Sequence, residues 1–386
     1  SNFTPQTNIS VNVKLVAAGT LLPSVLSGLG PDSFIGIGSV DTINYAIRSA
    51  VLPLNNYEGF DELCTEFTDA ALVPLTLEGQ TYGIPEKMSF SMMFYRMDVL
   101  ADLGLEVPES WDELLAALPT LQTNNMSIGV SYIDALDFMI YQSGESMWKY
   151  TDESVYDSKY AGARINLDDP DVLKTFDFTC RLYTDFSFPV SYDASNRFRT
   201  GEMPIVIGDY ASIYNTLVVY ATEIEGLWEF CPLPGSENLN EEDGFNYDSL
   251  AGVSATVILN GCDDLVTAWQ FTQWQTSASV QANYGNRIVA LIGPAAKYET
   301  ANINAIDDLS WTAREKASIK DQMANLDAIV NYPGSYYYGR YLKFAFLDVV
   351  NDGADPYDAL SGYVDAINAE ITRKREEFDL KTGDPE

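Results

Sequence analysis

The sequence of 386 residues contains no histidine and only four cysteines. Without histidine, Ser-His-Asp and Cys-His nucleophiles, histidine general bases and nearly every common zinc site are excluded. The composition still allows carboxylate chemistry and the binding of hard cations by oxygen ligands. It also allows recognition of a neutral polar ligand by aromatic and acidic side chains. We expect no catalytic residue, no cofactor and no metal.

Basic residues are scarce too, with 22 Lys and Arg against 56 Asp and Glu, a net charge of -34. This charge repels phosphate backbones, so nucleic acid is not an expected partner. No apolar run approaches the roughly 20 residues that span a bilayer. The start of the chain has neither the charged region nor the apolar region of a signal peptide, so we expect a soluble or already processed chain.

The cysteines are too few and too scattered to form a disulfide framework, and none lies in a Cys-x-x-Cys pair. We interpret Cys64, Cys180, Cys231 and Cys262 as buried thiols. A single bridge from Cys180 to Cys231 stays open, since sequence cannot supply the geometry that a disulfide requires.

Hydrophobic residues make up 46% of the chain and aromatic residues 12%, enough for a large core. The length favours two lobes. Ser110 and Glu113 form a capping-box pattern that predicts a helix start. Strands and helices alternate along the chain, which predicts parallel sheets with crossover helices. The expected strands are 9–16, 33–38, 89–95, 203–207, 228–233 and 253–259, and the expected helices are 41–52, 171–183, 213–221, 263–277, 313–330, 341–350 and one that begins at Asp355.

Several sequence blocks resemble, in their order, the extracellular solute-binding protein family that delivers carbohydrates to ABC importers, the group of maltose-binding protein. The resemblance covers most of the chain and rests on Asn8-Ile9-Ser10-Val11, Gly30-Pro31-Asp32-Ser33, Tyr82-Gly83-Ile84-Pro85, Leu103-Gly104-Leu105, Pro108-Glu109-Ser110-Trp111-Asp112-Glu113-Leu114, Phe198-Arg199-Thr200-Gly201-Glu202-Met203, Ile207-Gly208-Asp209-Tyr210, Pro232-Leu233-Pro234-Gly235 and Ala268-Trp269-Gln270-Phe271. The strand and helix that precede the first block in the family are not found here. Either the chain is shortened, or another segment takes their place, or the natural start lies upstream.

The resemblance implies an α/β fold of the two-lobed periplasmic-binding-protein type II class, with a ligand cleft between the lobes. Lobe one is expected to comprise residues 1–90 plus 255–302, and lobe two residues 91–254 plus 303–386. The implied function is non-catalytic: capture of a carbohydrate, with an oligosaccharide favoured, and its delivery to the membrane permease of an ABC importer by cleft closure. The implied protein is a monomer, either periplasmic or an extracellular lipoprotein anchored to the membrane.

The resemblance also implies which residues bind the ligand, because a sugar needs aromatic plates for its apolar faces and polar partners for its hydroxyls. Tyr210 is the best single candidate, since it stands where family members stack a sugar ring. Trp111 and Trp269 lie at apolar positions of expected helices and are interpreted as core. The candidates are Tyr210, Asp209, Tyr337, Tyr336, Ser39, Asp41, Lys87, Phe90, Tyr132, Asp134, Trp148 and Tyr284.

Other functions stay open. A polyamine or peptide would suit an acidic, aromatic cleft, and a metal chelate is a further possible ligand. A glycoside hydrolase would need two carboxylates about 5 to 9.5 Å apart, and no local motif selects such a pair. A structural or adhesion module is disfavoured by the order of the blocks.

Overall fold

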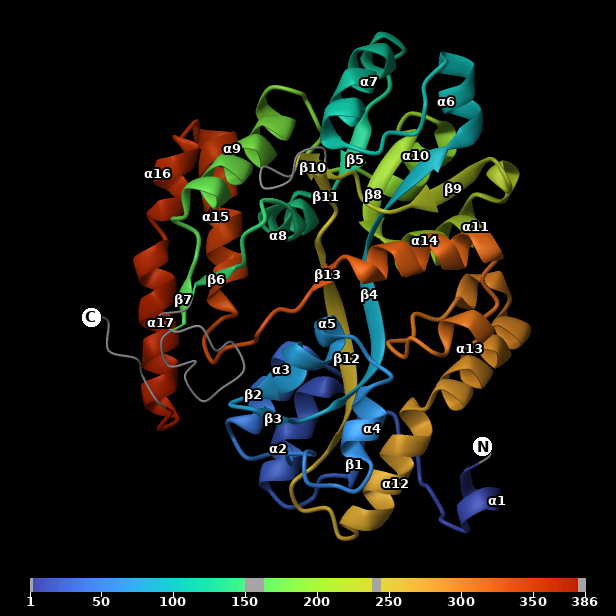
Figure 1. Cartoon of the computed structure of the whole chain (residues 1–386), viewed down its shortest axis with the longest axis vertical. Coiled ribbons are helices and arrows are strands. Elements are labelled where there is room, and N and C mark those ends of the chain that lie inside the picture. Colours follow the sequence, from blue (N-terminus) through green and yellow to red (C-terminus); the bar gives the residue numbers. More distant parts are fainter. Residues whose placement is uncertain (1–2, 150–162, 238–243, 381–386) are drawn as a thin grey trace.

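The computed structural model describes residues 3–149, 163–237 and 244–380 of the chain. It has two lobes stacked along the long axis, and strands β4 (Ile84–Arg96) and β12 (Ser249–Ile258) run from one lobe into the other (Figure 1). The other strands are β1 (Ser33–Gly38), β2 (Thr76–Leu77), β3 (Gln80–Thr81), β5 (Ile128–Val130), β6 (Trp148–Lys149), β7 (Arg164–Ile165), β8 (Ile205–Asp209), β9 (Trp228–Cys231), β10 (Ser236–Glu237), β11 (Phe245–Asn246) and β13 (Leu326–Asp327).

The main sheet has the order β1-β12-β4-β8-β5, with β13 beside β12 and β9 beside β4. The first half of β4 pairs with β12, and from Ser91 onward β4 pairs with β8 instead. Most pairs are antiparallel; only β5 with β8 and β12 with β13 are parallel among the described strands. The expectation of parallel sheets was therefore wrong for most of the sheet, because the long strands that link the lobes pair with strands of opposite direction.

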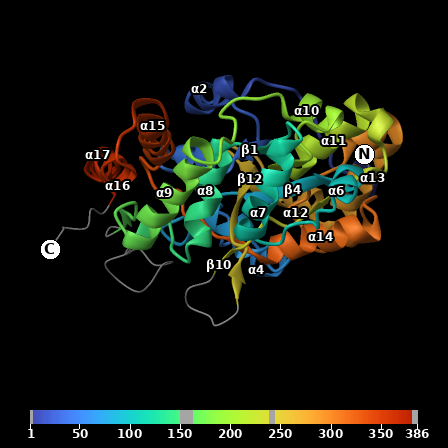
Figure 2. The same ribbon diagram turned by 90° about the horizontal axis from the view of Figure 1, so that it is seen from above.

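Helices cover both lobes, and from above α15 lies beside α8 and α9, on the opposite side of the molecule from α10 and α11 (Figure 2). The α-helices are α1 (Phe3–Thr7), α2 (Leu21–Leu26), α3 (Ser39–Ala46), α4 (Phe60–Cys64), α5 (Asp69–Leu72), α6 (Met97–Leu103), α7 (Trp111–Thr123), α8 (Tyr132–Gln142), α9 (Pro170–Thr184), α10 (Ala194–Thr200), α11 (Tyr210–Tyr220), α12 (Leu265–Thr276), α13 (Ala278–Ile292), α14 (Ala313–Ala324), α15 (Tyr337–Asp352), α16 (Pro356–Ser361) and α17 (Val364–Glu377). Short 3₁₀ turns lie at 18–20, 73–75, 222–224, 294–296 and 306–308.

Several helix starts follow from local sequence. Ser110 caps α7 by accepting a hydrogen bond from the Glu113 amide at 3.2 Å, as expected, while the Glu113 carboxylate accepts from the amide of Glu109 rather than that of Ser110. A complete capping box, formed by Thr312 and Glu315, begins α14. These side chains satisfy backbone amides that have no partner inside their own helix.

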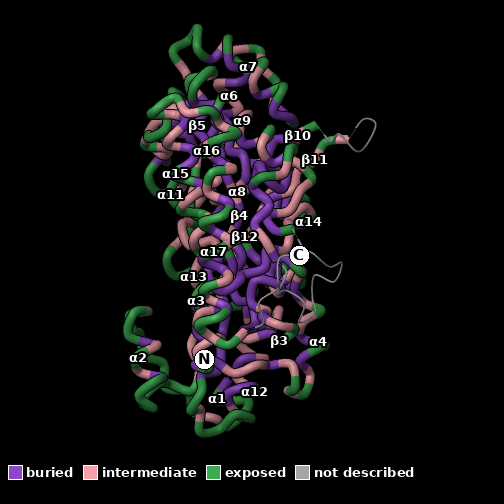
Figure 3. Tube along the Cα trace, turned by 90° about the vertical axis from the view of Figure 1, so that its left-hand side faces the viewer, coloured by how far each residue is buried: buried purple, intermediate pink, exposed green. Residues whose placement is uncertain are grey.

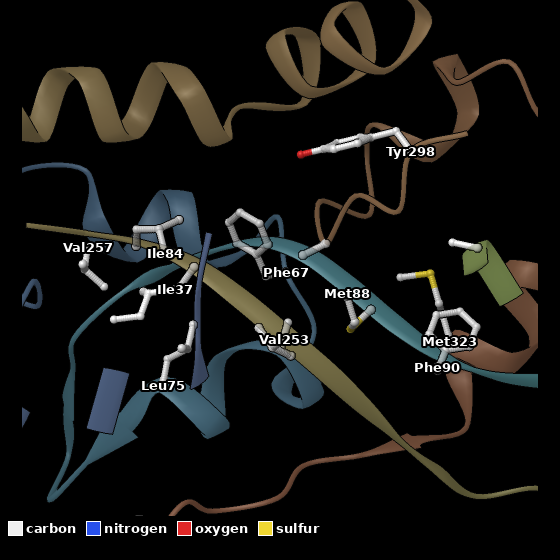
Figure 4. Close-up of a cluster of buried hydrophobic side chains, with 14 of the residues drawn as sticks. Ile37, Phe67, Leu75, Ile84, Met88, Phe90, Val253, Val257, Tyr298 and Met323 are labelled. Carbon is white, nitrogen blue, oxygen red and sulfur yellow. The ribbon is translucent and has the colours of Figure 1, made fainter. Parts of the chain in front are cut away.

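Buried apolar side chains form two clusters. One surrounds the lower halves of β4 and β12, where Ile84, Met88, Val253 and Val257 lie on the two crossing strands (Figure 4). The other packs around α8, α9 and α15. The buried positions run through the middle of the molecule, whereas α2 stands out to one side (Figure 3).

Two expectations about local structure were wrong. Residues 9–16 form no strand, and Val13 and Leu15 are exposed, because no neighbouring strand pairs with this segment in the described structure. The helix that begins at Asp355 is interrupted after Ser361 and continues as α17. All four cysteines are free thiols, as interpreted from the sequence, so the open alternative of a Cys180–Cys231 bridge is not formed; only Cys180 is fully buried, and the other three are half-buried.

Among the described residues, no helix combines the length and the apolar character that crossing a membrane requires.

Candidate functional site

The strands place two polar strand ends near the junction of the lobes. β1 ends at Gly38, which pairs with Ser254 of β12, and Ser254 also pairs with Lys87 of β4. β8 ends at Asp209, opposite Ser91 of β4. Because α3 and α11 begin directly after β1 and β8, the first turns of both helices lie at this junction.

In lobe one, Ser39 and Asp41 occupy the first turn of α3. Ser39 is half-buried and Asp41 is exposed. The helix start is fixed by Thr42, whose hydroxyl donates to the Gly38 carbonyl at 3.0 Å. Ser39 and Asp41 therefore lie on a defined helix end beside β12.

Lys87 is held between two residues of the segment that follows α13. Its ammonium lies 3.6 Å from the Glu299 carboxylate and 5.3 Å from the centre of the Tyr298 ring. The Lys87 side chain is 42% exposed, so this ion pair adds little stability. Burial raises the pKa of the Glu299 carboxyl, and Lys87 offsets only part of this rise.

Asp209 caps α11 by accepting a hydrogen bond from the Ser212 amide at 2.8 Å. Tyr210, the next residue, is only 3% exposed, and its ring lies 4.7 Å from Phe90 and 5.9 Å from Trp311 between ring centres. Phe90 is buried as well. In this structure Tyr210 and Phe90 thus form the packed wall behind Asp209 and have no free ring face.

The first turns of α8 bring two carboxylates to the same junction. Burial raises the pKa of Asp134, and the nearby Asp209 raises it further, although a hydrogen bond from Ser131 lowers it. Burial also raises the pKa of Asp137 to about 7, with a smaller contribution from Asp134. Tyr132, at the start of the helix, stacks flat on Phe346 with ring centres 4.5 Å apart.

Four carboxylates at the junction affect one another's pKa, and we call them the acidic row: Glu299, Asp209, Asp134 and Asp137. Asp209 raises the pKa of both Glu299 and Asp134, and Asp134 raises that of Asp137, in each case in addition to burial. Lys87, bound to Glu299 at one end, is the cation that pairs with the row among the described residues.

Trp148, on β6, is 3% exposed and packs edge-on against two tyrosines. Its ring centre lies 4.9 Å from that of Tyr332 and 6.1 Å from that of Tyr338. The indole N–H is buried and has no hydrogen-bond partner among the described residues. Trp148 is therefore a core residue by packing, with one unsatisfied donor.

The three tyrosines at 336–338 differ in their surroundings. Tyr336 is 43% exposed and donates its hydroxyl to Glu370 at 2.8 Å. The Tyr337 ring lies against Tyr336 and Tyr341, with the Arg340 guanidinium 5.4 Å from its centre. Tyr338 contacts Trp148 instead. The structure thus brings Tyr338, rather than Tyr336 or Tyr337, next to Asp137, which raises the Tyr338 pKa after burial.

Tyr284 lies on α13 and is 51% exposed. Its ring meets Tyr298 edge-on, with ring centres 5.1 Å apart. Tyr284 is therefore joined to Lys87 through Tyr298 and has no direct contact with the acidic row in the described structure.

Sequence reasoning did not identify Glu299, Asp137, Tyr141 and Tyr338. Asp137 and Tyr141 follow Asp134 at i+3 and i+7, a spacing that puts all three on one helix face and that could have revealed them. Glu299 carried no local signal, because its position depends on a bridge between Lys87 and Thr300, far apart in sequence.

Two cavities in the described structure, of about 250 and 470 Å³, lie away from these residues. The smaller is lined mainly by residues of α7, α8, α9 and the β10–β11 hairpin, and the larger by residues of α11, β9 and α14. Neither is lined by a candidate residue from the sequence.

One group of three carboxylates, Glu145, Asp169 and Asp171, has oxygens within 4.8 Å of one another, a spacing that could hold a cation. Asp169 already caps α9, since its carboxylate accepts from the Asp171 amide at 2.8 Å. Glu145 accepts from the Asn166 amide group at 3.3 Å. These hydrogen bonds and the helix start account for the group without a metal.

The sequence pattern of the bacterial extracellular solute-binding protein family matches residues 1–308. The chain therefore belongs to this family of non-catalytic binding proteins, as the resemblance implied.

Curated relatives match over shorter segments. A candidate binding protein of Brucella abortus is 26% identical over 152 residues, which is 38% of this chain and 36% of the relative. A candidate ABC transporter periplasmic-binding protein of Escherichia coli, YcjN, is 27% identical over 166 residues, 42% of this chain and 36% of the relative. The match thus spans about a third of the length of these relatives.

Solved structures match over nearly the whole chain. The sugar-binding protein MalE of Xanthomonas citri has a TM-score of 0.80 at 17% identity, covering 98% of this chain and 94% of that one. A cyclo/maltodextrin-binding protein in complex with maltotetraose has a TM-score of 0.75 at 18% identity, covering 96% and 91%. A solute-binding protein of Thermotoga lettingae bound to α-D-tagatose has a TM-score of 0.69 at 18% identity, covering 96% and 94%. At these identities the likeness establishes the two-lobed fold.

Proposed function

We propose that this protein captures a carbohydrate at the junction of its two lobes and delivers it to the permease of an ABC importer. The observation that carries the proposal is the acidic row, which crosses the junction partly buried and has Lys87 as its cation. Family membership and the sugars printed for similar structures, maltotetraose and tagatose, support the same class of ligand.

The chemistry of the junction suits a sugar. Carboxylates accept hydrogen bonds from sugar hydroxyls, and such charge-assisted bonds are about twice as strong as neutral ones. Asp134, Asp137 and Asp209 supply carboxylates, while Tyr132 and Tyr338 supply aromatic edges and hydroxyls beside them. We expect Ser39, Asp41 and Lys87 to complete the site from lobe one.

We also propose the division into lobes that the sequence predicts, residues 1–90 plus 255–302 and residues 91–254 plus 303–386. β4 changes its pairing partner from β12 to β8 between Phe90 and Ser91, next to one of these boundaries. Closure would occur by bending at the strands that cross between the lobes. The protein is proposed to act as a monomer outside the cytoplasm, with a lipid anchor as one route to the membrane.

The test is thermal unfolding with a panel of mono- and oligosaccharides, with polyamines, amino acids and short peptides as the contrasting set. Ligand that binds only the folded chain stabilises it, by about 2.7 kcal/mol at 100 times the dissociation constant. We expect a saturable shift with one class of sugar and recovery of that sugar unchanged. A response confined to polyamines or peptides would overturn the carbohydrate assignment, and chemical conversion of the sugar would overturn capture.

Asp209→Asn sharpens the test, because asparagine also caps helices and should keep α11 intact while removing the charge. Asp264→Asn is the matched control: Asp264 caps α12 by the same kind of hydrogen bond, from Thr267 at 3.1 Å, and lies outside the acidic row. We expect weaker sugar binding in the first variant only. Equal affinities in both variants would remove Asp209 from the site.

A further inference from the structure

The larger of the two cavities is separate from the acidic row and has a distinct chemistry. It has a volume of about 470 Å³ and lies between α11, β9 and α14, which meet on the right-hand side of the upper lobe (Figure 1). Sites for small molecules commonly have volumes of about 300 to 1,000 Å³. None of the described residues that line the cavity belongs to the acidic row.

Three aromatic residues line this cavity: Tyr214 from α11, and Trp228 and Phe230 from β9. The ring of Tyr214 is close to perpendicular to both others, at 72° to Trp228 and 89° to Phe230, with ring centres 5.4 and 6.2 Å apart. Trp228 and Phe230 are two residues apart on a strand and therefore share one face of it. Rings that meet near right angles are the walls of aromatic cages, which bind cations through the negative face of each ring.

The same group of rings already holds one ammonium. The Lys297 nitrogen lies 4.8 Å from the centre of the Trp311 ring and 5.8 Å from that of Tyr214. Asn215 fixes the position of Lys297, because its side-chain amide donates to the Lys297 carbonyl at 3.1 Å and accepts from the Lys297 backbone N–H at 3.0 Å. Lys297 is not among the described residues that line the cavity, so its ammonium leaves the cavity free for a second cation.

The charged residues that line the cavity are three carboxylates and one guanidinium. Arg314 lies 2.5 Å from Glu229 and is neutralised by it. Glu225 and Glu315 are the surplus, and Glu315 is held in place because its carboxylate accepts from the Thr312 amide at 2.7 Å. Burial raises the pKa of the Tyr214 hydroxyl, and Glu315 and Glu225 raise it further, which agrees with their position beside the ring. The surplus of negative charge favours a cationic ligand.

The apolar walls restrict the kind of cation. A primary ammonium is strongly hydrated and carries three donors, each of which needs an acceptor when it leaves water. Leu217, Val218 and Pro294 line the cavity between the rings and offer no side-chain acceptor. A quaternary ammonium has no donor to satisfy, and its methyl groups are apolar, so it suits walls of this kind.

We propose that this cavity binds a small quaternary ammonium compound. Its methyl groups lie against the rings of Tyr214, Trp228 and Phe230. Its positive charge faces the carboxylates of Glu225 and Glu315. The inference is independent of carbohydrate capture, since it concerns other residues and another ligand.

The experiment is calorimetric titration of the full chain with choline and with 3,3-dimethyl-1-butanol, at one fixed sodium concentration. The alcohol has the shape of choline with carbon in place of the charged nitrogen, so the pair isolates the charge. We expect choline to bind saturably and at least about tenfold more tightly than the alcohol, because a cation desolvated against aromatic rings gains this much.

Two variants locate the site. Glu225→Gln removes one exposed carboxylate at the cavity and should weaken choline binding about two- to fivefold. Glu106→Gln is the matched control, an equal charge change at an exposed residue that does not line the cavity, and should leave choline binding unchanged. Trp228→Leu should weaken it by about tenfold, through loss of a ring wall. If Trp228→Leu does not fold, the pair of glutamate variants still decides.

Four outcomes would overturn the proposal. The first is equal affinity for choline and the neutral alcohol, and the second is equal loss in Glu225→Gln and Glu106→Gln, which would reflect net charge alone. The third is loss of choline binding in Asp209→Asn but not in Glu225→Gln, which would place the cation at the acidic row. The fourth is absence of saturable binding by a chain that is folded by circular dichroism. Carbohydrate capture is unaffected by each of them, because sugar titration measures it separately.

Discussion

Two aromatic regions at the lobe junction differ in how completely the protein satisfies them. Around Tyr210, the rings of Phe90 and Trp311 pack with ring centres 4.7 and 5.9 Å away, and no buried side-chain donor of these residues lacks a partner among the described residues. Around Trp148, the rings also pack, but the indole N–H has no hydrogen-bond partner among the described residues. The first region is a satisfied core, whereas the second is a core with an unsatisfied donor.

The difference shows why a sequence motif and a structural site need not coincide. The resemblance implies Tyr210 as a sugar contact, yet its ring is packed against Phe90 and Trp311 and is only 3% exposed. The sequence analysis does not single out Asp137, yet burial raises the pKa of its carboxyl to about 7, whereas the rise at Asp134 is smaller. Whether packed rings or unsatisfied polar groups mark the ligand contact can be tested residue by residue.

The largest expected effect is on stability, from Tyr210→Ala. Replacing a fully packed aromatic ring by alanine leaves a cavity and costs about 3 to 5 kcal/mol in the free energy of unfolding. Tyr284→Ala, at a ring that is 51% exposed, is the control and should cost less than about 1 kcal/mol. Urea unfolding measures both. Similar losses in the two variants would show that Tyr210 is not part of the core.

Tyr210→Phe separates packing from ligand contact at the same position. Phenylalanine keeps the ring against Phe90 and Trp311, so we expect stability close to that of the unmodified chain. If sugar affinity falls by about 1 to 3 kcal/mol in this variant while stability holds, the Tyr210 hydroxyl contacts ligand and the contrast between the two regions fails.

The second effect concerns the dependence of stability on pH. The pKa of Asp137 is raised from its usual 3.8 to about 7, so the protonated carboxyl is favoured in the folded chain. The stability that the protonated Asp137 carboxyl contributes is fully present below about pH 4 and is lost as pH rises through 7. The free energy of unfolding falls over this range by at most about 4 kcal/mol, at 1.36 kcal/mol per pKa unit.

Asp137→Asn should remove this loss, so the variant should gain stability relative to the unmodified chain between pH 4 and 7.5, in the absence of ligand. Urea unfolding at intervals of one pH unit gives the difference directly. Asp102→Asn, an equal charge change at an exposed site on α6, should follow the unmodified chain throughout. A constant difference across this range would mean that Asp137 ionises normally and that its carboxylate is well solvated.

Trp148→Phe tests the unsatisfied donor, with Trp269→Phe as a matched control. Both tryptophans are buried, but the Trp269 indole donates to the Glu58 carbonyl at 2.9 Å, whereas the Trp148 indole has no partner in the described structure. Losing a satisfied hydrogen bond costs about 0.5 to 1.5 kcal/mol. Trp269→Phe should therefore destabilise the chain by about 1 kcal/mol more than Trp148→Phe does.

We expect the two tryptophan variants to rank in the opposite order for the loss of sugar affinity. Trp148→Phe is expected to weaken sugar binding by about 1 to 3 kcal/mol, and Trp269→Phe to leave it unchanged. Calorimetry on the two variants measures this, and unfolding in urea supplies the stabilities. Equal affinities would make Trp148 a core residue of the same kind as Trp269.

Much of the fold was predictable because it depends on local patterns. The cap at Ser110, the apolar face of α9 and the Asp-Pro start at Asp355 all appear in the sequence at the spacing that a helix requires. The direction of strand pairing was not predictable in this way. It depends on β4 and β12 crossing between lobes, which is a property of residues far apart in sequence.

The residues of the candidate site also differ in whether local sequence patterns predict their positions. Asp209 and Asp134 lie at ends of elements that the sequence predicted, and the structure brings them within electrostatic reach of each other. Glu299 reaches Lys87 through a bridge between distant segments. The sequence favours Tyr337, whereas Tyr338 is the ring of the tyrosine run that contacts Trp148, because the turn before α15 sets the direction of each ring and its geometry is not encoded in periodicity.

The smallest expected effect is at Tyr336, which tests whether the outward half of the tyrosine run takes part in binding. Tyr336→Phe removes the hydrogen bond to Glu370, a bond that joins α15 to α17 at a half-exposed position. We expect a loss of stability of about 0.5 to 1 kcal/mol, because Glu370 also keeps its ion pair with Arg373. Sugar affinity should not change, since the Tyr336 side chain is held by Glu370 and Tyr337 and no contact joins it to Asp137 or Trp148 among the described residues. If calorimetry shows weaker binding in Tyr336→Phe than in Trp148→Phe, the ligand lies against the outer tyrosines, and the unsatisfied donor of Trp148 needs another explanation.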